Sequence, residues 1–313
     1  MKAALIVAGW IAAPVLYMAL FPDSLVLASQ ILLMGLFALS LDLLVGYAGV
    51  ASLGHAVFFG IGAYGAGLLA ANGWGEPLSA LVLTMLVAAI FALPVGLLVV
   101  RGGSLGRLMI TLGIATLVSE AANRASGITG GADGLQGMDV WPLLGLFSYD
   151  LQGRTGFVYA WIVLTLGFLA VRSIVASPFG LSLQAIRENP VRAAALGTPV
   201  RARLTFAFVL SAALAGAAGA VMAQTTQVVA LNSLGVHLSA DVLVMLLIGG
   251  VGRLYGGLIG AAIFMVVHHW LSDLDPVYWQ IWIGLILIGA ALAAPDGILG
   301  AIEKLRSRKQ VAW

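Results

Sequence analysis

The amino-acid sequence predicts an all-α membrane protein with about ten transmembrane helices, some of them discontinuous. Apolar residues make up 61% of the chain and charged residues only 9%, whereas about a quarter of a soluble protein is charged. The apolar residues gather in segments, most of which are near the roughly twenty residues that a membrane-spanning helix requires. The ten segments are residues 4–21, 25–46, 50–71, 78–100, 105–122, 156–173, 204–223, 240–252, 257–271 and 278–294.

The first segment resembles a secretory signal peptide, because Lys2 precedes an apolar stretch that ends near Phe21. No clear cleavage site follows, and many apolar segments come after it. We therefore interpret residues 4–21 as an uncleaved first helix. The sequence then predicts one transmembrane domain over residues 1–300 and a basic tail over residues 301–313.

Glycines interrupt the apolar pattern at two places. Ser52 and His55 lie in a glycine-containing break that follows segment 25–46. Segments 240–252 and 257–271 are both short and lie on either side of a second glycine-rich run. Short, glycine-interrupted segments are typical of discontinuous helices in transport proteins.

The distribution of Lys and Arg predicts the membrane topology, because these residues concentrate in cytoplasmic loops. If the N-terminus is inside and the chain crosses ten times, 13 of its 15 basic residues lie inside and only Arg124 and Arg154 lie outside. The loop at 123–155 is then outside, and both termini are inside. The basic residues placed inside are Lys2, Arg101, Arg107, Arg172, Arg187, Arg192, Arg201, Arg203, Arg253, Lys304, Arg306, Arg308 and Lys309.

The inside loop at 174–203 contains a short helix with clear start and stop signals. Asn189 is a favourable N-cap, and Pro190 fits the first helical position, where no backbone N–H is needed. Helix-forming residues follow, and Gly197 can adopt the left-handed conformation that ends a helix. The sequence therefore predicts a stiff helix at 190–196 that another protein can push.

Small residues recur at intervals of four within several segments. This spacing allows helix backbones to approach closely in lipid, and it predicts a tightly packed bundle without specifying a function. The repeats are Gly62, Ala66 and Ala70; Ala212, Gly216 and Ala220; and Gly256 and Gly260.

Asp42, Ser52 and His55 are the candidates for a substrate path. Asp42 falls inside an apolar segment, where a charged side chain is costly and is a functional candidate by default. The alternative is an Asp near the cytoplasmic helix end that is hydrated or hydrogen-bonded to a neighbour. Ser52 and His55 either line or gate the path, or their hydrogen bonds hold the broken helix together.

Other polar residues predict local interactions. Glu120 and Arg124 are four residues apart near an outer helix end, which favours an ion pair. His268, His269, Asp273 and Asp275 suggest a metal site, but zinc sites usually show clearer spacing. We interpret these four as interfacial polar residues and predict no metal site.

Several function classes are excluded. The chain has no cysteine and therefore no thiol chemistry or disulfide framework. It has no Gly-Lys pair, so a phosphate-binding loop for ATP is absent. The net charge of +2 follows membrane topology and does not indicate nucleic-acid binding. No cluster of nucleophile, acid and base stands out, and no cofactor site is predicted.

Five motifs follow one another along the chain. They are residues 41–64 (LDLLVGYAGVASLGHAVFFGIGAY), 129–135 (TGGADGL), 185–197 (AIRENPVRAAALG), 207–216 (AFVLSAALAG) and 248–260 (IGGVGRLYGGLIG). In this order they resemble the segments of LivM-type permeases, which are membrane subunits of ABC importers for branched-chain amino acids. Gly54 before His55 is more similar to LivM-type than to LivH-type subunits, and position 42 is Asp where the family more often has Asn.

The resemblance implies a subunit of the bacterial inner membrane that pairs with a LivH-like permease, two cytoplasmic ABC ATPase subunits and a periplasmic substrate-binding protein. Loop 123–155 would be periplasmic, and ATP hydrolysis would occur on the partners. The implied substrates are branched-chain or other hydrophobic amino acids, with urea or short amides as an alternative within the family. The residues expected to couple to the ATPases are Arg187, Glu188, Asn189, Pro190, Arg192, Ala193, Ala194, Ala195 and Gly197.

The sequence fits two other function classes less well. An ion-coupled secondary transporter needs ionisable groups at membrane depth, and Asp42 is nearly the only one far from a segment end. An intramembrane enzyme needs paired catalytic groups at that depth, which the sequence does not show.

Overall fold

The computed structural model describes residues 10, 14–150, 152–276, 278–293 and 297–301. These residues fold as helices joined by loops, which confirms the all-α prediction. Half of segment 4–21 and nearly all of the tail 301–313 lie outside the described residues. The long helices are α2 (Leu25–Asp42), α3 (Ala56–Ala71), α4 (Pro77–Arg101), α5 (Ser104–Arg124), α7 (Arg154–Ala176), α8 (Pro178–Glu188), α10 (Val200–Thr226), α11 (Val236–Gly249), α12 (Gly256–Leu274) and α13 (Trp279–Ala293).

Short helical pieces complete the fold. They are η1 (Pro22–Ser24), the π-helix η2 (Leu43–Tyr47), α6 (Ser126–Thr129), η3 (Gly131–Asp133), α9 (Pro190–Ala195) and η4 (Leu231–Leu234). The π-helix continues α2, so that Pro22–Tyr47 forms one long apolar unit.

Six helical units in the described residues are long and apolar enough to cross a membrane: Pro22–Tyr47, α4, α5, α7, α10 and α12. The sequence predicted about ten segments, and α3 and α11 account for part of the difference. Their 16 and 14 residues give lengths of about 24 and 21 Å, less than the roughly 30 Å of a hydrocarbon core. Non-helical residues 48–55 precede α3, and a turn at 250–255 separates α11 from α12, at the two places where glycines interrupt the sequence pattern.

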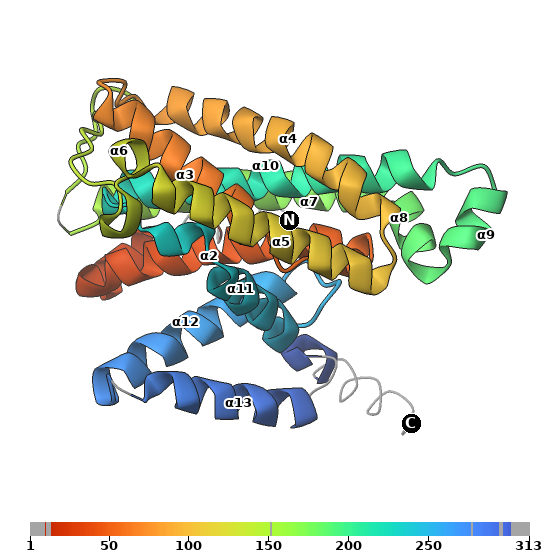
Figure 1. Cartoon of the computed structure of the whole chain (residues 1–313). Coiled ribbons are helices and arrows are strands. Elements are labelled where there is room, and N and C mark those ends of the chain that lie inside the picture. The colour runs from red at the N-terminus through yellow and green to blue at the C-terminus, as the bar shows by residue number, and fades with distance from the viewer. Residues whose placement is uncertain (1–9, 11–13, 151, 277, 294–296, 302–313) are drawn as a thin grey trace.

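The bundle has two distinct ends (Figure 1). Helices α8 and α9, which we call the elbow, lie at one end, and α6 lies at the other. Helix α10 packs against α2, α3 and α4, and α12 packs against α2 and α11. In the apolar 18-residue stretch of α10, 72% is buried inside the protein, whereas in that of α5 only 11% is buried. Thus α10 is a central helix, and α5 is peripheral in the isolated chain.

The glycine repeats produce very close helix contacts, as the small-residue pattern predicted. A Cβ placed on Gly62 of α3 would lie 2.0 Å from the carbonyl oxygen of Gly216 in α10. A Cβ on Gly260 of α12 would lie 1.7 Å from the carbonyl oxygen of Met245 in α11. Only glycine permits these backbones to approach so closely.

Candidate functional site

The capping signals of the elbow act as the sequence predicted. The Oδ1 atom of Asn189 accepts a hydrogen bond from the Arg192 backbone N–H at 2.9 Å, which caps the start of α9. Gly197 has a φ of +86°, and its N–H donates to the Ala194 carbonyl at 3.0 Å. The Thr198 N–H donates to the Ala193 carbonyl at 3.1 Å, which completes a Schellman stop. The helix ends at Ala195, one residue before the predicted end.

The structure adds a second helix to the elbow that the sequence analysis did not identify. Helix α8 begins after Ser177, whose hydroxyl accepts a hydrogen bond from the Gly180 N–H, and Pro178 is its first residue. It buries Leu183 and Ile186 and exposes Leu181. The elbow is therefore a pair of capped helices, and the buried face of α8 anchors it on the bundle.

The tip of the elbow exposes apolar side chains. Val191 is 78% and Leu196 79% exposed, while Ala193 is buried. A surface hollow of about 360 Å³ adjoins the tip. It is lined by Val100, Arg107, Pro190, Val191, Ala194, Val200, Arg201 and Leu204. An apolar tip beside a partly basic hollow is a surface that a protein partner can cover.

Arg187, an exposed residue near the end of α8, connects the elbow to η2. Its guanidinium Nη1 donates a hydrogen bond to the carbonyl oxygen of Gly46, in the π-helix η2. Close by, Asp42 accepts a hydrogen bond through Oδ1 from the Gly252 N–H at 2.7 Å. Asp42 is fully buried, and its Oδ2 has no hydrogen-bond partner among the described residues. The structure thus brings together Asp42 and Arg187, which the sequence analysis had assigned to different roles.

His55 lies in a separate, fully buried cluster with Ser40 and Ser211. Its Nε2 is 3.0 Å from Ser40 Oγ and 3.3 Å from Ser211 Oγ. Both hydroxyls already donate, Ser40 to the Phe37 carbonyl at 2.6 Å and Ser211 to the Ser40 carbonyl at 2.5 Å. Nε2 must therefore carry the proton and donate to the serine oxygens. The other ring nitrogen, Nδ1, has no partner among the described residues.

Side-chain hydroxyls satisfy the backbone of the break at 48–55. The Ala56 N–H donates to Ser239 Oγ at 2.9 Å, and the Leu53 N–H donates to Thr111 Oγ1 at 3.2 Å. Ser52 is buried, and its Oγ accepts from the Gly54 N–H at a long 3.4 Å. Irregular backbone inside a membrane protein requires such partners. Ser52 and His55 thus have structural contacts, and their role in a substrate path stays a prediction.

Several residues of these clusters were missed at the sequence level. Ser40, Ser211 and Ser239 are fully buried, although they lie in apolar helices. A buried hydroxyl within an apolar segment is a recognisable signal, but the sequence alone does not identify its partner.

Polar residues at the end of the bundle opposite the elbow make local contacts. The Arg124 Nε lies 2.7 Å from Glu120 Oε1, which confirms the predicted ion pair. Glu76 caps α4, and hydrogen bonding by Ser79 holds the pKa of Glu76 below its ordinary value. His269 and Asp273 pair at 3.8 Å. Within the described residues, no three possible metal ligands gather in one place.

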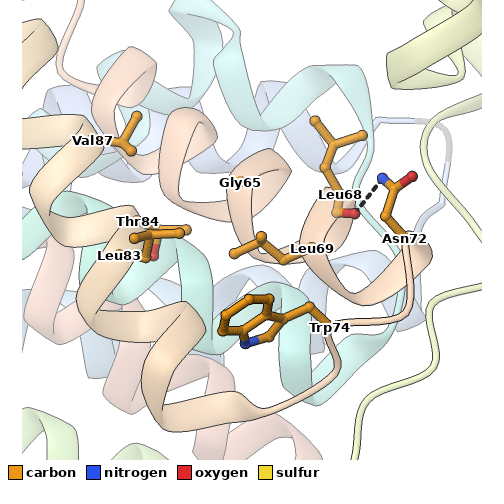
Figure 2. A pocket seen from close by; sticks show the side chains of 8 residues that line it. All are labelled: Gly65, Leu68, Leu69, Asn72, Trp74, Leu83, Thr84 and Val87. Atoms are coloured by element: carbon orange, nitrogen blue, oxygen red, sulfur yellow. Dashed lines mark hydrogen bonds between the residues drawn. The ribbon is translucent and has the colours of Figure 1, made fainter.

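A second hollow, of about 400 Å³, lies between α3 and α4 (Figure 2). Its lining is mostly apolar and includes Leu69, Trp74 and Val87, and Asn72 donates to the Leu68 carbonyl at its rim. None of Asp42, Ser52 and His55 contributes to it. This hollow is therefore a feature of the outer wall, separate from the two clusters.

Comparison with known proteins identifies a family. The model of the family described as the permease component of the branched-chain amino acid transport system matches residues 24–291. The high-affinity branched-chain amino acid transport system permease protein LivM of Salmonella typhimurium is 29% identical over 87% of this chain and 69% of its own length. The Escherichia coli LivM is 28% identical over 84% and 67%, respectively.

A more distant similarity extends to the other type of subunit. The probable branched-chain amino acid transport permease protein LivH of Methanocaldococcus jannaschii is 27% identical over 64% of this chain and 63% of its own length. No solved structure matches the chain.

Proposed function

Because the chain belongs to the family of permease components of branched-chain amino acid transport systems, we propose that it forms the LivM-like half of an ATP-driven importer. The chain is a multi-pass membrane permease subunit of an ABC importer and is not itself an enzyme. The hydrolysis of ATP takes place on partner chains.

The assembly contains a LivH-like second permease, two cytoplasmic ATPase subunits and a periplasmic binding protein that delivers substrate. The substrate is a branched-chain or other hydrophobic amino acid. This follows the two LivM relatives at 28% and 29% identity, which are named as permeases of branched-chain amino acid transport. Residues 1–300 form one transmembrane domain of the bacterial inner membrane that crosses about ten times, with both termini in the cytoplasm. Loop 123–155 is then periplasmic and loop 174–203 cytoplasmic.

The observation that carries the proposal is the elbow. It lies at the end of the bundle that also carries Arg101, Arg107 and Arg201, as the positive-inside rule requires of a cytoplasmic surface. Its tip is capped at both ends of α9 and exposes Val191 and Leu196. A rigid apolar tip in this place suits a docking element on which an ATPase acts.

Reconstitution tests the proposal. The chain is expressed with the partner subunits and inserted into proteoliposomes together with the binding protein, and the uptake of labelled leucine is measured. Uptake should require ATP on the side of the ATPases, and ionophores that collapse ion gradients should not reduce it. Uptake driven by a proton or sodium gradient without ATP would instead identify a secondary transporter. Competition by urea or acetamide, but not by isoleucine, would move the substrate to the amide class.

A further inference from the structure

Arg187 is exposed, and its guanidinium lies against the part of the bundle where two helix breaks meet. It donates to the carbonyl oxygen of Gly46, in the π-helix that ends the first long apolar unit. A hydrogen bond from an ionised donor is among the stronger ones in proteins. The contact spans 141 residues of sequence and fixes the last turn of α8 to the end of η2.

The junction around Arg187 is built from glycines. A Cβ on Gly49 would lie 3.0 Å from Arg187 Cγ, and a Cβ on Gly252 would lie 3.0 Å from Arg187 Nη1. A Cβ on Gly46 would lie 2.0 Å from Asp42 Oδ1 and 2.6 Å from the Gly252 nitrogen. Any larger residue at Gly46 would collide with this arrangement, so the absence of side chains lets the guanidinium and the two backbones meet.

Asp42 fixes the second break to the first. Its Oδ1 accepts from the N–H of Gly252, which lies in the loop between α11 and α12 and has a φ of +76°. The guanidinium of Arg187 lies beside the same glycine, since a Cβ on Gly252 would be 3.0 Å from Nη1. One arginine therefore holds η2 directly and lies against the loop between α11 and α12, which Asp42 ties to the end of α2.

We infer that Arg187 is a positioning residue that transmits movement of the elbow to both helix breaks during transport. Its guanidinium holds η2 through Gly46, and Asp42 passes the displacement to Gly252. The inference rests on the proposed function, because it assumes that an ATPase moves the elbow. It differs from a docking role, since the guanidinium of Arg187 binds η2 of this chain and not the ATPase.

The test compares substitutions that keep the size of the side chain. Arg187→Met removes the donor and the charge, whereas Arg187→Lys keeps a charged donor. The matched control is Arg172→Met, at an exposed arginine near the C-terminal end of α7, which leads into α8. Each variant complex is reconstituted, and three quantities are measured: co-purified ATPase, the rate of ATP hydrolysis and the amount of leucine taken up per ATP.

Co-purification shows separately whether Arg187→Met still assembles with the ATPases, since Arg187 lies in the segment expected to meet them, and uptake per ATP is compared between assembled complexes. Uptake per ATP should fall about tenfold or more, which corresponds to the loss of one hydrogen bond from a charged donor. Arg187→Lys should recover most of the loss, and Arg172→Met should match the wild type. Asp42→Asn keeps the acceptor for Gly252 and should transport, whereas Asp42→Leu should lose coupling as Arg187→Met does.

Two outcomes would overturn the inference. The first is normal uptake per ATP in Arg187→Met. The second is restoration of that ratio in the double variant Arg187→Met/Asp42→Asn, which would mean that Arg187 only neutralises a buried carboxyl group. The double variant also serves if Arg187→Met alone folds poorly. If the wild-type chain does not bind ATPases, the proposed function is wrong. That outcome is separate from a change in uptake per ATP, which tests only the inference about Arg187.

Discussion

The contact between α3 and α10 makes a sharp prediction about glycine. Gly62→Ala would place a Cβ 2.0 Å from the carbonyl oxygen of Gly216, although Cβ atoms do not approach other heavy atoms more closely than 3.0 Å. The two backbones must therefore separate by about 1 Å. At Gly113 of α5 the same substitution meets nothing within 4 Å. The two variants are a matched pair, because both add one methyl group to the interior of a helix.

The expected free energies have opposite signs. Alanine is favoured over glycine in a helix by about 1 kcal/mol, which both variants gain. Overpacking typically costs about 1–3 kcal/mol, and a clash between backbones lies at the upper end or beyond, since neither atom belongs to a flexible side chain. Gly62→Ala should therefore lower the free energy of unfolding by about 2 kcal/mol or more, and Gly113→Ala should leave it unchanged or raise it by up to about 1 kcal/mol.

The measurement is thermal unfolding of the isolated chain in detergent, followed by tryptophan fluorescence. Gly216→Ala supplies an intermediate case, because its Cβ would meet the Ala88 Cβ at 2.7 Å and no backbone atom closer than 3.5 Å. The order of stability should be Gly113→Ala, then Gly216→Ala, then Gly62→Ala. Equal midpoints for Gly62→Ala and Gly113→Ala would refute the close crossing of α3 and α10.

Three further outcomes are expected. Cysteines introduced at Ala132 and Ser307 should react oppositely with an impermeant reagent in intact cells, and labelling of Ser307 from outside would mean an odd number of crossings. Asn189→Ala should destabilise α9 by about 1 kcal/mol and reduce co-purification of the ATPases. Asn189→Asp should have neither effect, because it keeps the cap. Equal co-purification by the two variants would argue against the cap. Ser239→Ala should leave the buried Ala56 N–H unpaired and lower the free energy of unfolding by about 1–3 kcal/mol. Ser239→Thr keeps the acceptor and is the control. Equal stability of the two variants would exclude that hydrogen bond.

Features encoded by neighbouring residues could be predicted from the sequence. Asn189 and Gly197 delimit α9 because a cap needs only its own side chain or backbone freedom and the next few amides. The ion pair of Glu120 and Arg124 follows from helical spacing alone. The small-residue repeats predicted close packing, although they did not specify which helices meet.

Contacts between distant segments could not be predicted. Arg187 meets Gly46 across 141 residues, and Asp42 meets Gly252 across 210. Both pairs depend on how α8, η2 and the loop between α11 and α12 are arranged in space. A buried charge indicates only that some partner is needed, so Asp42 could be singled out without its partner.

The number of crossings illustrates a second limit. Apolar content defines segment 50–71, but in the structure α3 begins inside it, at Ala56, and α11 begins at Val236, before the predicted start of segment 240–252. Hydropathy does not distinguish apolar chain that is helical from apolar chain whose amides bind side chains such as Ser239 and Thr111. The described residues therefore contain fewer full-length helices than apolar segments.

Ala194→Asp tests most directly whether the elbow couples this chain to an ATPase. Ala194 is exposed in the isolated chain, so the change should alter the stability of the chain by no more than about 0.5 kcal/mol. In a buried contact, an unpaired charge should cost about 2–5 kcal/mol. The matched control is Ala132→Asp, an exposed alanine at the opposite end of the bundle. Co-purification of the ATPases and leucine uptake should fall together in Ala194→Asp, and Ala132→Asp should retain the ATPases. Wild-type values of both quantities in Ala194→Asp would contradict the elbow as the coupling element.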